Sequence, residues 1–461
     1  MPTYAYHTIV NMIKKGFIDT LSPIQKILLS FILLILAGTA LLKLPFATRS
    51  GISFVDALFT STSAVCVTGL IVLDTAKDFT LAGQFIILLL IQLGGLGIMT
   101  FSIAILSFIG ADLSIKWRFT FDSFYDAMKK LPIKSLLKKI IVYTLIIEAS
   151  IAIALFSQFA DHFTLPRAIW HSVFHAVSAF CNAGFSTFSN SLMDYRSNYI
   201  VQLAIGIGII LGGLGFLVLT ELAQAKRKRI KLFFGQFTLH TKFVLFITGI
   251  LIIMGIGVFL VLEWHYSIRD LSIGEKLFAA FFQSVTCRTA GFNTVDIGSL
   301  RSPTLFVMML LMFIGGSPGS IAGGIKTTTM GVIASLIYSK FRGSQQIVFW
   351  GRSLNSDTIE RSTSLMILAI FFITFSAFLL LTIDVFHVKD PFLAVLFEVT
   401  SAFGTVGLST GITSSISDPG RVLMCLVMYI GRLGPLTLIM ALTARRKRVN
   451  IEYPKEHIMI G

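Results

Sequence analysis

The chain has 461 residues, of which 55% are hydrophobic and only 13% are charged, and its formal net charge is +15. This composition excludes an ordinary soluble enzyme and places the chain in a lipid bilayer. A basic chain could also bind nucleic acid, but the basic clusters at 226–229 and 445–448 directly follow apolar segments. Membrane topology therefore explains the charge better than a nucleic-acid partner does.

Long apolar segments recur along the chain. Eight are predicted to cross the membrane as helices, at 27–42, 79–111, 140–160, 197–220, 243–262, 302–325, 362–383 and 422–444. A helix needs to cover roughly 30 Å of hydrocarbon, and the short first segment gains reach from Lys26 and Lys43 at its ends. An even number of spans predicts that both termini lie on the same side.

The connections between these spans differ in charge. Nearly all of the net charge of +15 lies in the segments 1–26, 112–139, 221–242, 340–361 and 445–461. Because cytoplasmic loops are enriched in Lys and Arg, these segments and both termini are predicted to be cytoplasmic. The sequence thus predicts a multi-pass protein of the cell membrane, surrounded by membrane lipids.

One pattern occurs four times between paired spans, with a Phe ten positions before a Gly. The copies read FTSTSAVCVTGL from Phe59, FHAVSAFCNAGF from Phe174, FFQSVTCRTAGF from Phe281 and FEVTSAFGTVGL from Phe397. The residues before each Gly suffice for a helix of about three turns, which is too short to cross a bilayer. Each copy is therefore predicted to be a re-entrant half-helix followed by a loop.

Four such loops indicate a central pore, because non-helical backbone at membrane depth is tolerated only inside protein or along a watery cavity. Glycine can adopt positive φ there and turn backbone carbonyls toward the axis, where they replace the water shell of a cation. The fourth loop has the first three letters of the TVGYG potassium filter, with Leu408 in place of Tyr. Potassium is favoured and sodium remains open. The predicted filter is Val67, Thr68, Gly69, Asn182, Ala183, Gly184, Thr289, Ala290, Gly291, Thr405, Val406 and Gly407.

These glycines could instead serve close helix packing, but four copies in register favour a filter. A second glycine pattern follows each loop, at Gly94, Gly212, Gly315 and Gly431. The predicted fold is an all-α membrane protein with four tandem helix–pore loop–helix repeats, pseudo-fourfold around one central ion pore. The predicted repeats are 1–110, 111–224, 225–345 with a broken inner helix, and 346–444, followed by a cytoplasmic tail at 445–461.

Two departures from the repeat predict a gate. Arg432 stands where the other repeats have glycine, and a buried cation below a cation filter would act as a barrier. The alternative is a structural arginine bonded to helix-end carbonyls. The third inner helix cannot continue through its glycines and proline, so a protein-lined loop is expected. The predicted gate is Gly315, Gly316, Ser317, Pro318, Gly319, Ser320, Gly323, Gly324, Lys326 and Arg432.

Other buried charges give weaker signals. Arg288 and Glu398 fall within re-entrant segments, where they either tune the ion field or act as bonded scaffold charges. Glu148 is the only hint of a proton site, although an interhelical hydrogen bond is the commoner role. His171 and His175 receive no function. The stretch ending at Lys326 lacks Walker spacing, so nucleotide hydrolysis and enzymatic activity are not expected, and no covalent cofactor is indicated.

Taken together, the four pore-loop units, the TVG of the fourth loop, the glycine-rich break and Arg432 resemble the Trk/Ktr/HKT superfamily of potassium transporters, and within it the membrane subunit of Ktr systems. The short segment before the first span and the ending from Tyr453 resemble Ktr rather than Trk subunits. The resemblance implies a homodimer with one pore per protomer, and a cytoplasmic ring of RCK-type nucleotide-binding regulatory subunits. It also implies a gate formed by the glycine-rich loop and Arg432, and stimulation of transport by sodium.

The function expected from the sequence is potassium uptake through a gated, channel-like pore, driven by the membrane potential without covalent chemistry. The alternative is a symporter that couples sodium or protons to potassium, for which Glu148 is the sequence hint.

Overall fold

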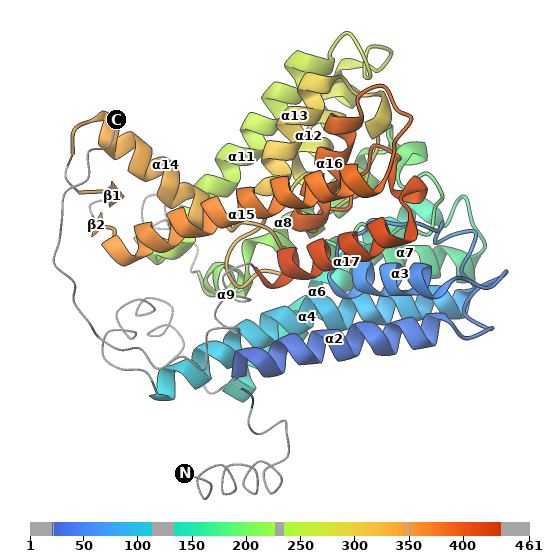
Figure 1. Ribbon diagram of the computed structural model, residues 1–461, viewed down its shortest axis with the longest axis horizontal. Helices are drawn as coiled ribbons and strands as arrows, with labels where there is room; N and C mark the ends of the chain where they lie inside the picture. Colours follow the sequence, from blue (N-terminus) through green and yellow to red (C-terminus); the bar gives the residue numbers. More distant parts are fainter. Residues whose placement is uncertain are drawn as a thin grey trace, which may run out of the picture.

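The computed structural model describes residues 21, 23–112, 133–225, 235–344, 346–349 and 352–434. Over these residues the chain is a bundle of helices (Figure 1), as the sequence predicts. One feature differs from an all-helical fold: a small hairpin in which β1 (Val348–Phe349) pairs antiparallel with β2 (Arg352–Ser353). The predicted tail at 445–461 and the basic clusters lie outside the described residues.

Four long apolar helices form the outer part of the bundle. They are α2 (Pro23–Leu42), α6 (Ile133–Phe159), α11 (Leu239–Glu263) and α15 (Ser356–Ile383). Each is long and apolar enough to cross a membrane, and only 28–33% of the residues in each spanning segment are buried. An apolar helix with most of its surface uncovered is stable in lipid rather than in water. These helices confirm four of the predicted spans.

Four short helices lie deeper in the molecule. They are α3 (Phe54–Val65), α7 (Leu165–Phe180), α12 (Ile273–Thr286) and α16 (Pro391–Gly404). Local chemistry starts them: Ser53 caps α3, and Ser272 with Glu275 forms a capping box on α12. Each packs against the long helix that precedes it. With 12 to 16 residues, none spans a bilayer.

The helices that follow the loops differ from one another. In the first repeat α4 (Leu81–Asp112) is continuous, as predicted. In the second, α8 (Tyr199–Leu214) and α9 (Phe216–Gln224) meet at an angle of 105°. The single span predicted at 197–220 is therefore wrong, because Gly215 has a φ of 90° and interrupts the helix.

The third and fourth inner helices also end early. α13 (Ser302–Phe313) is followed by a non-helical segment and then by α14 (Thr327–Phe341), so the expected break is present. α17 (Asp418–Leu433) ends at Gly434, which has a φ of 84°. The fourth predicted inner span therefore does not continue as one helix through this glycine, and its residues 435–444 lie outside the described part of the chain.

The inner and short helices pack against one another in a circular order. α4 packs against α3 and the next short helix α7, α8 against α7 and α12, α13 against α16, and α17 against α16 and α3. The last helix thus returns to the first repeat, where Arg421 Nη1 lies 2.6 Å from Asp56 Oδ1. Tyr429 also donates a hydrogen bond to the carbonyl of Leu28, at 2.9 Å. This circular order brings all four loops to one place.

Candidate functional site

The four loops share one backbone conformation. In each, a non-glycine residue with positive φ comes two positions before a glycine with positive φ. The pairs are Val67 (54°) with Gly69 (90°), Asn182 (56°) with Gly184 (70°), Thr289 (71°) with Gly291 (76°), and Thr405 (50°) with Gly407 (92°). A β-branched residue in this region costs on the order of 1–3 kcal/mol, so the surrounding structure must impose the conformation.

This alternation has a geometric consequence. In an ordinary strand successive carbonyl groups point to opposite sides, and reversing the sign of φ at every second residue turns them toward the same side. The residues between the paired positions, such as Thr68 and Val406, do not have positive φ. Each loop can therefore present consecutive carbonyl oxygens to a single neighbour, which is what a dehydrated cation requires.

The four glycines also meet one another in order. A Cβ atom added to Gly69 would lie 3.0 Å from the Cα of Gly184, and one added to Gly184 would lie 3.0 Å from the Cα of Gly291. From Gly291 the distance to the Cα of Gly407 is 3.1 Å, and from Gly407 it is 2.9 Å back to the Cα of Gly69. The loops therefore form a closed ring, and a side chain at any of the four positions would strike the next loop.

Hydroxyl groups of the short helices hold the loops from behind. Ser63 Oγ accepts a hydrogen bond from the Gly69 amide and Ser401 Oγ accepts one from the Gly407 amide, both at 3.0 Å. In the second loop Ser178 Oγ donates to the Phe185 carbonyl at 2.7 Å. These serines share one position in the repeat, where the third copy has Val285 instead.

Two titratable residues at one repeat position hold the chain that follows the glycine. Glu398 accepts hydrogen bonds from Ser409 Oγ and from the Thr410 amide, the latter at 2.9 Å. His175 Nε2 lies 2.9 Å from Ser186 Oγ. No function was predicted for the histidines from the sequence. In both repeats, however, a serine follows 11 positions after the His or Glu residue. Glu398 and His175 are bonded scaffold groups.

Three further charged or titratable residues noted in the sequence also have hydrogen-bond partners. His171 Nδ1 is 2.7 Å from Thr187 Oγ1 in the second repeat. Arg288 donates to Thr248 Oγ1 of α11 at 3.4 Å. Glu148 accepts from Gln92 of α4, also at 3.4 Å, so it makes the interhelical hydrogen bond that was the commoner expectation.

The glycine-rich segment after α13 lies against the fourth loop. A Cβ at Gly323 would strike the Thr405 side chain, and one at Gly324 would lie 3.4 Å from the Gly404 Cα. Backbone hydrogen bonds attach the segment to the second repeat: the Ser317 amide donates to the Gly213 carbonyl at 2.9 Å. The Phe216 amide donates to the Gly319 carbonyl at 3.1 Å. The segment thus fits into the break between α8 and α9.

The two positively charged side chains of the predicted gate both donate hydrogen bonds to carbonyl groups of this segment. Arg432 is only 4% exposed and donates to the carbonyls of Ile321 and Gly94, the latter at 3.2 Å. Lys326 Nζ donates to the Ala322 carbonyl at 2.6 Å. The arginine therefore bonds to backbone carbonyls, as in the structural alternative, although these belong to the non-helical segment and to the interior of α4 rather than to helix ends. These contacts join the segment to α4. The structure brings Arg432 and the glycine-rich segment together.

These features define a multi-pass membrane protein in which four short helices are followed by loops that meet in a ring. The family of cation transport proteins named TrkH matches residues 13–449, and the chain belongs to this family.

Relatives from three bacteria match nearly end to end. The chain is 38% identical to the potassium/sodium uptake protein NtpJ of Enterococcus hirae, over 98% of this chain and 100% of that protein. It is 37% identical to the Ktr system potassium uptake protein B of Bacillus subtilis, over 95% and 97% of the two chains. The protein of the same name from Vibrio alginolyticus is 38% identical, over 94% of each chain.

A solved structure supports the fold. The potassium transporter TrkH from Vibrio parahaemolyticus superposes with a TM-score of 0.72, over 92% of this chain and 86% of that one. At 20% sequence identity, this similarity establishes the fold alone.

Proposed function

We propose that the chain takes up potassium ions across the cytoplasmic membrane through a gated, channel-like pore. The observation that carries the proposal is the closed ring of four loops, each with the same alternation of φ. Carbonyl oxygens aligned in this way replace the hydration shell of a monovalent cation. The names of the relatives, each a potassium or potassium/sodium uptake protein, support potassium as the ion.

In this proposal the repeats 1–110, 111–224, 225–345 and 346–444 surround the pore with pseudo-fourfold symmetry. The filter consists of the three residues that end at Gly69, Gly184, Gly291 and Gly407. No bond is made or broken. A membrane potential, negative inside, contributes roughly 2.3 kcal/mol per 100 mV for each charge that enters.

The gate is the segment Gly315–Gly324 with Lys326 and Arg432. It lies next to Thr405, where it obstructs the inner end of the fourth filter loop. Opening requires the segment to leave the break between α8 and α9 and Arg432 to release the Ile321 carbonyl. Both attachments are hydrogen bonds to backbone atoms, and opening would also withdraw the fully buried Ile321 side chain from the core.

We further propose a homodimer regulated by a cytoplasmic ring of RCK-type nucleotide-binding subunits, with both termini cytoplasmic and with sodium as an activator. The words "Ktr system" in the names of two relatives support a multi-subunit assembly. The name of the Enterococcus relative includes sodium. The basic charge of the segments assigned to the cytoplasm supports the orientation.

A second candidate is a sodium- or proton-coupled potassium symporter. Glu148 favours it, because its side chain is buried and one of its carboxyl oxygens has no hydrogen-bond partner among the described residues. A buried carboxyl with a spare oxygen is a conceivable proton site.

Two measurements test the proposal. A bacterium that lacks potassium uptake should grow at low potassium when it expresses the chain, and better with a cytoplasmic regulatory subunit. In proteoliposomes, reversal potentials should follow the potassium gradient alone. No rescue by a chain present in the membrane would refute potassium uptake, and a shift with the proton or sodium gradient at fixed potassium would favour the symporter.

A further inference from the structure

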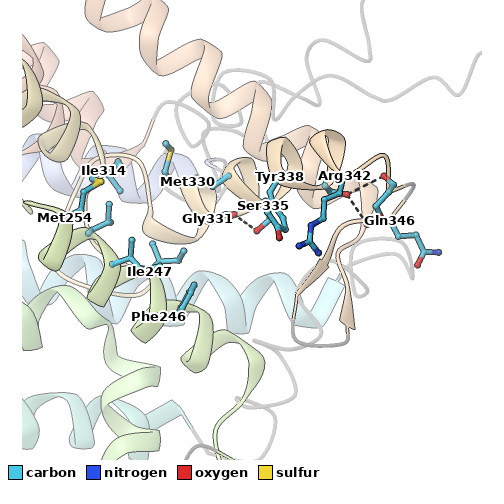
Figure 2. Close-up of a pocket in the computed structure, with 15 residues that line it drawn as sticks. Phe246, Ile247, Met254, Ile314, Met330, Gly331, Ser335, Tyr338, Arg342 and Gln346 are labelled. Atoms are coloured by element: carbon cyan, nitrogen blue, oxygen red, sulfur yellow. Dashed lines mark hydrogen bonds between the residues drawn. The ribbon is translucent and has the colours of Figure 1, made fainter.

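A cavity of about 580 Å³ lies between α11 and α14, away from the four loops (Figure 2). Its α11 wall includes Ile247, Ile250 and Met254, and its α14 wall includes Met330 and Ala334. Its size is within the roughly 300–1,000 Å³ of small-molecule pockets, and its lining is mostly apolar. None of these residues belongs to the filter.

The position of the cavity determines what can fill it. α11 is a candidate membrane span, and on it Phe246, Ile250 and Met254 are 47%, 44% and 45% exposed. Water gains no hydrogen bonds from apolar walls, whereas hydrocarbon surrounds the protein at this depth. The apolar walls therefore suit a hydrocarbon chain better than water.

One end of the cavity is polar. Arg342 is exposed at the end of α14, with its guanidinium 4.8 Å from the centre of the Tyr338 ring, and it forms no salt bridge among the described residues. The nearby hydroxyls are already used: Ser335 donates to the Gly331 carbonyl at 2.7 Å and Ser339 to the Gln346 carbonyl at 3.1 Å. Arg342 is thus the cationic group that the cavity offers to an anion (Figure 2).

The dimensions favour a thin occupant over a helix from a second copy. At Gly331 the helices touch, since a Cβ there would lie 2.5 Å from the Phe243 ring. An acyl chain is thin enough to lie between the two helices beside this contact.

We propose that a phospholipid binds here, with an acyl chain between α11 and α14 and its anionic headgroup on Arg342. Basic pockets between membrane helices recognise anionic headgroups in this way. The cavity also includes Ile314, the residue that follows α13 and pairs with Ile325 at the base of the glycine-rich segment. The lipid therefore lies beside that segment, but its binding does not depend on the proposed transport.

Native mass spectrometry of the purified full chain tests the site, with phosphatidylglycerol and phosphatidylcholine as probes. Ala334→Trp fills the cavity and should remove one tightly retained lipid. Arg342→Gln should reduce the preference for phosphatidylglycerol over phosphatidylcholine at least threefold. The matched controls are Ile253→Trp, on an α11 residue that is 72% exposed and does not line the cavity, and Lys340→Gln.

Two results would overturn the proposal. The first is that a folded Ala334→Trp or Arg342→Gln chain retains as much phosphatidylglycerol as the wild type. The second is that Ser335→Cys chains form disulfide-linked dimers in lipid nanodiscs, since a second copy would then cover the cavity. If Ala334→Trp does not fold, Arg342→Gln, on an exposed side chain, still decides the matter.

Discussion

The ring of four loops and the glycine-rich segment are both irregular backbone inside a membrane protein, yet they are held in different ways. Each loop of the ring is bonded to the short helix of its own repeat, as when Ser63 holds Gly69 and Ser401 holds Gly407. The glycine-rich segment is hydrogen-bonded within its own repeat and, in addition, to two others, through Gly213 of the second and Arg432 of the fourth. A loop anchored within its own repeat stays in place when repeats shift, whereas one anchored between repeats can be released.

The largest effect is expected from adding a methyl group to one glycine of the four-loop ring. Gly69→Ala places a Cβ against the second loop at a φ of 90°. We expect potassium flux in proteoliposomes to fall at least 100-fold, because strain and steric overlap act on the same residue. Gly257→Ala is the control, since nothing lies within 4 Å of a Cβ there. Normal flux in a folded Gly69→Ala chain would contradict the closed ring.

The next largest effect should come from removing the segment itself. Deleting Ser317–Gly324 leaves two ends that already lie together, because the Gly315 amide bonds the Ile325 carbonyl at 2.8 Å. Basal flux should rise about tenfold or more and regulation by a partner should weaken. The idea of a gate is wrong if transport disappears from a chain that still assembles normally.

A smaller increase is expected from Arg432→Ala. This change removes the contacts to Ile321 and Gly94 and the positive charge together. Basal flux should rise severalfold, and Arg432→Lys, which keeps the charge, separates the two causes. If the barrier is electrostatic, the lysine variant stays near the wild type; unchanged flux in the alanine variant at normal expression argues against any barrier.

The smallest effect is expected from removing a serine hydroxyl that holds one of the four loops. Ser401→Ala leaves the buried Gly407 amide without its partner, at a cost of about 1–3 kcal/mol. The preference for potassium over sodium, measured from reversal potentials, should fall severalfold while basal gating is unchanged. Val285→Ser in the third repeat, where the serine is naturally missing, is the matched change and should have little effect. Equal losses in both variants would show that the hydroxyl position does not matter.

Repetition made the loops predictable. One Phe-to-Gly spacing in four copies located the short helices and the ring glycines, and apolar length located the outer helices. The positive φ of Val67 and Thr405 was not predictable from local preference, because β-branched residues avoid this region. Packing against the neighbouring loops and the short helices imposes it.

The inner helices show where the local sequence does not predict the backbone conformation. The same five letters, LGGLG, lie within continuous helix at 93–97 and interrupt the helix at 211–215. Glycine costs about 1 kcal/mol in a helix and permits either outcome. At Gly215 a contact from outside these five residues favours the break: the Phe216 amide donates a hydrogen bond to the Gly319 carbonyl. That carbonyl belongs to another repeat, so no reading of the five letters alone predicts the break.

The contact between Arg421 and Asp56 joins residues 365 positions apart. In synthesis from the amino terminus, α3 emerges and inserts long before α17 exists, and Asp56 has no Arg421 to pair with until the last repeat arrives. Contacts of such high sequence separation form late. A truncated chain would keep an open ring, with the Asp56 carboxylate at its edge bonded to the Ser53 side chain but not to a cation.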